Sequence, residues 1–229
     1  MTEAEWLTAT DPTPMLEHLR GKASDRRCRL IGCACCRRVW HLYDSAGRNA
    51  VEVAERVADG QATGSERRVA TAPVRHRYGG DLFGYGPQAV ISISAQFAGS
   101  SGSSYAAWNQ TEALVGPKPT PEQPLTVHLH YNERANNQFA IERAAQSILV
   151  RDIFGNPFRP VALDPTWRTE AVVGLATGIY ADRAFDRLSV LADALEDAGC
   201  ADADVLTHCR GPGPHVRGCW VVDLLLGKS

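Results

Sequence analysis

The sequence lacks a large excess of charge of either sign, since its formal net charge is −2 over 229 residues. We therefore expect no general electrostatic attraction to nucleic acid or to an anionic membrane surface. Long apolar runs are also missing, because no segment approaches the roughly 18 uninterrupted apolar residues of a membrane-spanning helix. The first ten residues carry Glu3 and Glu5 where a secretory signal has positive charge, and they contain no apolar run. These absences predict a cytoplasmic protein with no membrane partner.

Motifs of the common enzyme classes are absent as well. The chain contains no glycine-rich nucleotide loop, no nucleophile elbow of the α/β-hydrolase type and no metalloprotease helix motif. Their absence favours a non-enzymatic interaction or scaffolding module, whose partner we expect to be a protein. The competing prediction is a metal-dependent or thiol enzyme that uses the cysteines and histidines of the C-terminal segment.

Apolar residues at helical spacing are abundant in the first sixty residues and again after about residue 137. These segments end at glycines and begin at capping residues. Asp164 and Pro165 are an example of such a start, an N-cap followed by a proline in the first turn. A hydrophobic fraction of 44% suits a soluble domain with a core of its own. We therefore predict a mostly α, single-domain helical bundle that spans 1–229.

The segment 61–137 differs from these helical regions because it is rich in glycine, serine and proline. Two stretches within it, Ile91–Phe97 and Leu125–Tyr131, alternate apolar and polar residues, which is the period of a half-buried strand. We interpret the segment as an irregular insertion in the bundle that carries a two-stranded β unit. Loops on a rigid body are common sites of recognition, so we expect the protein partner to bind there.

Five strings of the sequence are distinctive: MTEAEWL at the start, RLIGCACCRRVWHL, RDIFGNPFRPVALDPTW, RAFDRLSVLADALEDAGCADADVLTHCR and HVRGCWVVDLLLGK. Together they resemble a family of uncharacterised helical proteins abundant in planctomycete bacteria. The resemblance covers both ends of the chain and leaves the middle unmatched. It implies a helical protein, and it implies no activity, ligand or catalytic residue.

Cysteine is absent from the long middle of the chain, and all seven cysteines lie towards its two ends. In a chain expected to be cytoplasmic, the odd count favours free thiols or metal ligands over disulfides. Zn²⁺ prefers four ligands such as thiolates and imidazoles in a tetrahedral arrangement. If the two ends fold against each other, a structural zinc could link the N-terminal and C-terminal helices. The candidate ligands are Cys33, Cys36, His208, Cys209, His215 and Cys219.

A helical wheel separates the N-terminal cysteines into two pairs. Cys28 and Cys35 lie at the centre of the apolar stripe, whereas Cys33 and Cys36 lie at its edge. We therefore predict that the central pair packs in the core and that the edge pair is available to a metal. The alternative is that all of these cysteines pack as small hydrophobic residues.

At the other end, Pro214 predicts the start of a final, strongly apolar helix. His215, Cys219 and Asp223 would recur on one face of this helix, four residues apart. A thiol enzyme could use Cys219 as the nucleophile and His215 as its base, with Asp223 or Asp204 orienting the imidazole. The apolar surroundings of Cys219 argue against this hypothesis, because a reactive thiol needs an exposed, electropositive pocket.

Arginines are concentrated between Arg26 and Arg38. Such a cluster can bind phosphates, but it is more often a solvated helix face, and the acidic C-terminal third offers an internal counterpart. We therefore expect no nucleic-acid partner. Asp223, in an otherwise apolar segment, needs a cationic partner, for which Arg37 and Arg38 are candidates.

Overall fold

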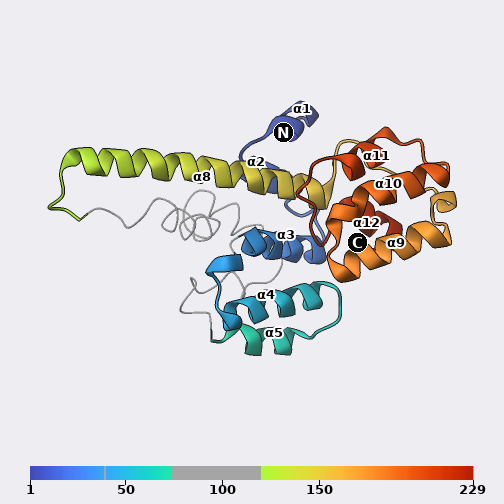
Figure 1. Cartoon of the computed structure of the whole chain (residues 1–229), viewed down its shortest axis with the longest axis horizontal. Helices are drawn as coiled ribbons and strands as arrows, with labels where there is room; N and C mark the ends of the chain where they lie inside the picture. Colours follow the sequence, from blue (N-terminus) through green and yellow to red (C-terminus); the bar gives the residue numbers. More distant parts are fainter. Residues whose placement is uncertain (39, 74–119, 229) are drawn as a thin grey trace. The chain divides into compact units, whose positions relative to one another are not determined.

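The computed structural model describes residues 1–38, 40–73 and 120–228 (Figure 1). Within these ranges the chain consists of α-helices joined by turns and short 3-10 segments, and it forms no strand there. The predicted mostly α fold class is confirmed for this part of the chain. None of the helices in the described ranges is long and apolar enough to cross a membrane.

The chain forms two compact units, Met1–Ser147 and Ile148–Ser229. Each contains a hydrophobic cluster of its own, one around Cys33 and Tyr43 and the other around Leu191 and Val222. That 1–229 is a single domain stays a prediction.

Capping residues account for where helices of the first unit begin. Thr2 forms a capping box with Glu5, and Thr63 forms another with Glu66. Asp11 accepts a hydrogen bond from the Thr13 amide just ahead of the helix that Pro12 opens. The elements of this unit are α1 (Glu3–Thr8), α2 (Pro12–Leu19), α3 (Asp25–Arg38), the 3-10 turn η1 (Trp40–Leu42), α4 (Ser45–Ala58), α5 (Gly64–Thr71) and most of α8 (Leu125–Phe154).

Two buried carboxylates fasten α3 to its neighbours in the first unit. Arg37 donates two hydrogen bonds to Glu55 of α4, at 2.9 and 2.8 Å. Arg38 donates to Glu142 of α8 in the same bidentate way, at 3.0 and 2.9 Å. The two arginines that we considered as partners of Asp223 are therefore engaged by glutamates of their own unit.

Helix α8 is the largest departure from the sequence prediction. Leu125–Tyr131, predicted as a strand, forms the first turns of a helix of 30 residues. Alternation over seven residues also places Leu125 four positions from Leu129, which is the spacing of a helix face, so the pattern fits either structure. No glycine or proline interrupts the chain from Leu125 to Phe154, and this favours the helix.

The predicted insertion 61–137 is also narrower than expected, because α5 and the first turns of α8 occupy its two ends. The other predicted strand, Ile91–Phe97, lies outside the described residues.

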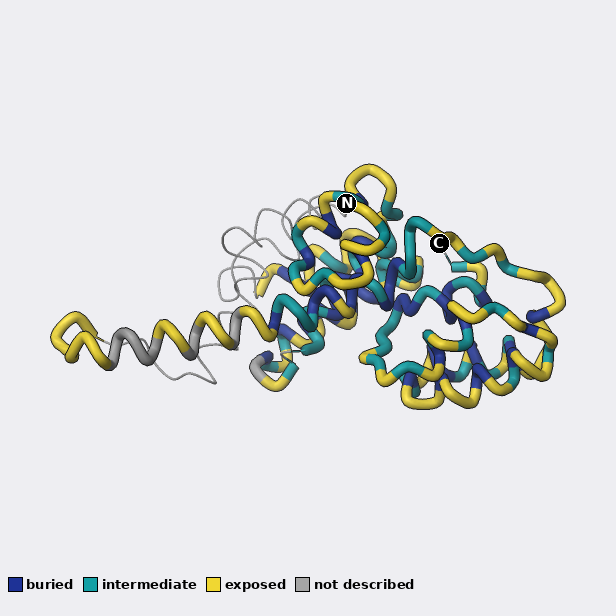
Figure 2. The backbone as a smooth tube through the Cα atoms, turned by 90° about the horizontal axis from the view of Figure 1, so that it is seen from above, coloured by how far each residue is buried: buried dark blue, intermediate teal, exposed yellow. Residues whose placement is uncertain are grey.

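The second unit packs its helices around an apolar core. Val172, Leu191, Leu195 and Val222 are fully buried there. The elements of this unit are the end of α8, the 3-10 turn η2 (Pro165–Trp167), α9 (Glu170–Asp182), the 3-10 turn η3 (Phe185–Arg187), α10 (Leu188–Asp197), α11 (Ala203–Arg210) and α12 (Trp220–Leu226). Helices of this unit such as α9 and α10 bury one face and expose the other, as an amphipathic helix requires, whereas α12 has no exposed position (Figure 2).

The final helix is shorter than predicted. It begins at Trp220 rather than at Pro214, and residues 211–219 form a loop in which Gly213 and Gly218 have φ values of +73° and +96°. Repeated glycines favour this loop because they adopt positive φ at little cost. The prediction that His215, Cys219 and Asp223 share one helix face is therefore wrong.

Gly155 ends α8 in the left-handed conformation, with φ +65°. A Cβ atom at this position would lie 3.2 Å from Cγ of Trp220, the first residue of α12. The absence of a side chain at Gly155 therefore allows the end of α8 to pack against the indole.

We predict that Gly155→Ala destabilises the protein more than Gly199→Ala. Gly199 also has a positive φ, +86°, but a Cβ there would meet nothing within 4 Å. Both variants introduce left-handed strain, and only Gly155→Ala adds a contact with Trp220, so we expect its free energy of unfolding to fall by about 1–2 kcal/mol more. Urea unfolding followed by circular dichroism measures the difference, and equal losses for the two variants would contradict the packing role of Gly155.

Candidate functional site

Four side chains with metal-binding or catalytic chemistry converge within the second unit. Asp152, His208, His215 and Cys219, hereafter the Asp152 cluster, each contribute one ligand atom, and these atoms all lie within 4.8 Å of one another. The Asp152 side chain is 3% exposed and Cys219 is fully buried, while the two imidazoles are 17% and 10% exposed. The cluster is therefore an interior feature that solvent reaches only at the histidines.

Each member comes from a different segment. Asp152 lies in the last turn of α8 and His208 in the last turn of α11. His215 lies in the loop 211–219, and Cys219 occupies the N-cap position of α12. The glycines of the loop shape this arrangement, because a Cβ at Gly213 would approach the backbone nitrogen of His215 to 2.9 Å.

The distances converge on the Asp152 carboxylate. Nδ1 of His215 lies 2.6 Å from Oδ1 of Asp152, and Nε2 of His208 lies 3.2 Å from the same oxygen. Nε2 of His208 also lies 3.2 Å from Sγ of Cys219. The other ring nitrogen of His215, Nε2, is buried and has no hydrogen-bond partner in the described part of the chain.

A backbone amide holds the Asp152 carboxylate in place. The Val216 amide donates to Oδ2 of Asp152 at 2.9 Å, which leaves Oδ1 to face the imidazoles. Cys219 makes no side-chain capping hydrogen bond at the start of α12, although the amides of Val222 and Val221 are near enough to its sulfur to favour the thiolate. A ring contact also supports His208, whose imidazole centroid lies 5.2 Å from that of Trp220.

Burial favours a higher pKa for both Asp152 and Cys219, but only the pKa of Cys219 is raised. Burial alone would raise the pKa of Asp152, yet hydrogen bonds from His208 and His215 outweigh it and hold this pKa below its usual value. Burial and the nearby Asp152 carboxylate raise the pKa of Cys219 well above its usual range, against the smaller effect of the backbone amides. In the absence of a cation, Cys219 is therefore a protonated thiol.

No protein-family model matches this chain, and neither a curated protein nor a solved structure shows significant similarity to it. The resemblance to the planctomycete proteins therefore stays a prediction. The geometry of the Asp152 cluster carries the functional conclusion.

Three of the six predicted metal ligands belong to the cluster, namely His208, His215 and Cys219. Cys209 does not, because it packs in the apolar core of the second unit, where burial raises the pKa of its thiol to about 12. Asp152 was missed by the sequence analysis. Its one signal was a carboxylate within the apolar run that ends α8.

The remaining two predicted ligands, Cys33 and Cys36, lie in the core of the first unit. Sγ of Cys33 lies 4.0 Å from the carbonyl oxygen of Val51, and the thiol of Cys36 is hydrogen-bonded to Tyr43. Cys28 is buried as the wheel predicted, but the distinction between the pairs is wrong for the other three, since Cys33 and Cys36 are buried and Cys35 is only half-buried. The reason is that α4 covers the edge of the stripe that the wheel assigned to solvent. All seven cysteines are free, as predicted.

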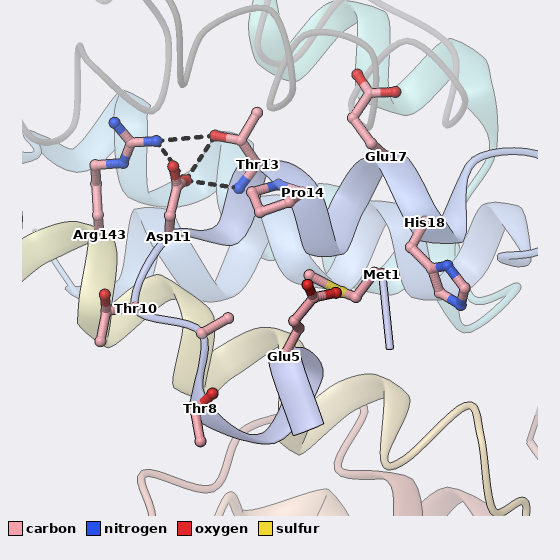
Figure 3. Close-up of a pocket in the computed structure, with 11 residues that line it drawn as sticks. Met1, Glu5, Thr8, Thr10, Asp11, Thr13, Pro14, Glu17, His18 and Arg143 are labelled. Atoms are coloured by element: carbon pink, nitrogen blue, oxygen red, sulfur yellow. Dashed lines mark hydrogen bonds and ion pairs between the residues drawn. The ribbon is translucent and has the colours of Figure 1, made fainter. Parts of the chain in front are cut away.

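An open groove of about 1080 Å³ lies in the first unit, between residues of α1, α2 and α8 (Figure 3). At one end Thr13 donates to Asp11 at 2.7 Å and Arg143 donates to Thr13 at 3.0 Å. Glu5, another lining residue, completes the capping box of α1. These polar groups serve the structure of the unit itself, and none of the predicted site residues lines the groove.

We predict that Cys219 is unreactive in the folded protein near neutral pH. Its thiol is buried and its pKa is raised, so the thiolate that reacts with alkylating reagents is scarce. Iodoacetamide labelling followed by peptide mass spectrometry should show little modification of Cys219 in native protein and complete modification in denaturant. Rapid labelling of Cys219 in the native state would instead support a reactive thiol.

Proposed function

We propose that the chain is a non-enzymatic helical scaffolding module that binds a protein partner. We also propose that the Asp152 cluster stabilises the fold of this module and is not an active site. The observation that carries the proposal is the burial and convergence of the four side chains. The cluster joins the end of α8, the end of α11 and the loop 211–219, which are three separate segments of the second unit.

The competing thiol enzyme finds little support in the same geometry. In a Cys–His–Asp relay, one ring nitrogen accepts the proton of the nucleophile and the other nitrogen contacts the carboxylate. Here a single nitrogen, Nε2 of His208, faces both Cys219 and Asp152. His215, the base suggested by the sequence, has its Nδ1 against Asp152. Cys219 is also fully buried, so a substrate has no direct approach to its sulfur.

Exposed apolar side chains support a protein partner that binds at the insertion. Among the exposed large hydrophobic residues of the described chain, the three with the highest exposure are Val69 (75%), Leu125 (73%) and Ile141 (59%). The first two lie within the predicted insertion 61–137 and the third lies just beyond it. Val69 lies on α5 and Leu125 begins α8, so exposed apolar side chains stand on both helices that occupy the ends of the predicted insertion, and exposed apolar surface is a common feature of protein interfaces.

Nucleic acid is not the proposed partner, because arginines of the N-terminal cluster are engaged by carboxylates. Arg37 and Arg38 pair with Glu55 and Glu142, and Arg26 pairs with Asp59 at 3.2 Å. We also propose that the protein is cytoplasmic.

Asp152→Ala should strongly destabilise the second unit. The change leaves the Val216 amide and both imidazoles without the buried carboxylate they face, and losing one partner of a buried charged group costs about 3–5 kcal/mol. The matched control is Asp193→Ala, which removes a carboxylate paired with Arg210 but 71% exposed, and it should leave the unfolding midpoint nearly unchanged. Urea titration measures the unfolding midpoint of each variant. Similar midpoints for the two variants would contradict a structural role of the Asp152 cluster.

A photoreactive amino acid tests the binding surface. Benzoylphenylalanine introduced at Val69 or Leu125 should form crosslinks to another protein in the cells that make this chain. Placed at Val190, which is 47% exposed on α10 of the second unit, it should form few or none. Mass spectrometry of the crosslinked bands identifies what is captured. Equal crosslinking at all three positions, or crosslinks to RNA, would contradict a protein partner at the insertion.

A further inference from the structure

We propose that the Asp152 cluster holds one Zn²⁺ ion, bound by Oδ1 of Asp152, Nε2 of His208, Nδ1 of His215 and Sγ of Cys219. The inference rests on the proposed function, because it names the ligand of the same structural cluster. It differs from the zinc site suggested by the sequence, since all four ligands lie in the second unit and one of them is a carboxylate.

The four atoms all lie within 4.8 Å of one another, so one tetrahedral ion could reach them all after shifts of roughly 1 Å. Zinc lies about 2.0–2.2 Å from nitrogen or oxygen and about 2.3 Å from sulfur, so tetrahedral ligand atoms are separated by roughly 3.3–3.6 Å. The two contacts of His208, each 3.2 Å, are already close to this value. Nδ1 of His215 and Oδ1 of Asp152, now 2.6 Å apart, would separate by less than about 1 Å.

The set of donor atoms selects the metal. One thiolate and two imidazoles favour Zn²⁺ or Co²⁺ over Mg²⁺ and Ca²⁺, which take oxygen ligands. Because four protein groups fill the tetrahedron, no position remains for water or substrate, and the ion would be structural. The burial of Asp152 and Cys219 suits such a closed site.

Neighbouring groups already orient the proposed ligands. The Val216 amide donates to Oδ2 of Asp152 at 2.9 Å, and Cys219 is held at the N-cap position of α12. Contacts of this kind, made by groups around the ligands, set ligand orientation in metal sites. Trp220 packs against the His208 ring and limits its rotation.

A bound cation also accounts for the close approach of the four side chains better than hydrogen bonds among them do. A proton on Nε2 of His208 can point at only one of its two neighbours, Oδ1 of Asp152 or Sγ of Cys219. A cation at the centre contacts all four atoms at once and neutralises the charge of the carboxylate and the thiolate together. Three segments would then be held by a single ion, as in other domains that a metal stabilises.

The test begins with the full chain, stripped of metal by a chelator and then titrated with Zn²⁺ or Co²⁺. We expect one zinc per chain by elemental analysis. With Co²⁺ we expect the intense visible absorption of a tetrahedral ion and a near-ultraviolet charge-transfer band from one thiolate. X-ray absorption of the zinc-loaded protein should show one sulfur and three nitrogen or oxygen ligands. These measurements on the unmodified chain do not depend on a variant that folds.

Variants then distinguish this ligand set from the one suggested by the sequence. Cys219→Ser should abolish the charge-transfer band, and Asp152→Asn should weaken zinc binding by at least about tenfold. Cys209→Ser, Cys33→Ser and Cys36→Ser are controls that remove a buried thiol outside the cluster, and each should keep the band and the stoichiometry. Loss of the band in Cys33→Ser or Cys36→Ser, with Cys219→Ser unaffected, would overturn the proposed ligands.

Failure of this inference and failure of the proposed function give different results. If the stripped chain binds no zinc while Asp152→Ala still destabilises it far more than Asp193→Ala, the zinc site is wrong and the structural cluster stands. If zinc binds with a water in its coordination sphere and Cys219 is readily alkylated, the site is open and both the closed zinc site and the non-enzymatic function are wrong.

Discussion

The second unit depends on a carboxylate buried at the end of a helix. A charged carboxylate in an apolar interior is costly unless charged or hydrogen-bonding groups surround it. Asp152 is 3% exposed, so the chain has to bring such groups to it. They come from α11 and from the loop that precedes α12, as His208, His215 and the Val216 amide. The packing of these segments at the end of α8 follows from this requirement.

The first unit meets the same requirement with different chemistry. Glu55 and Glu142 are as deeply buried as Asp152, and each receives a bidentate arginine from α3. Guanidinium groups carry a permanent charge and bind no metal, so these pairs are complete as they stand. Asp152 instead faces two imidazoles and a thiol, groups that bind either protons or a metal ion. The difference in partners, rather than in burial, makes the second cluster a candidate metal centre.

Capping residues were predictable because capping is local. Asp164 accepts from the Thr166 amide as predicted, since a capping side chain needs only its immediate neighbours in sequence, but it caps the 3-10 turn η2, and the α-helix that follows begins at Glu170 behind its own N-cap, Thr169. The strand prediction for Leu125–Tyr131 was wrong because a short alternating pattern does not by itself distinguish a strand from a helix. Seven alternating residues satisfy the helical and the extended spacing alike, and only the longer stretch without glycine or proline favours the helix.

Three of the four residues of the Asp152 cluster were among the six predicted ligands, but only the fold shows which of the six come together and adds Asp152 to them. His208 and Cys209 are adjacent on α11, and adjacent helical residues point about 100° apart, so when His208 faces Asp152 its neighbour faces the core. Spacing along the chain cannot say which of the two faces the site. His215 is harder still, because it lies on a loop whose course depends on Gly213 and Gly218 at positive φ. Asp152 has no periodic relation to any of them. A carboxylate in the mainly apolar last turns of α8 is nevertheless a signal in itself, because a buried charge needs partners, and here histidines and a cysteine from elsewhere in the same unit surround it.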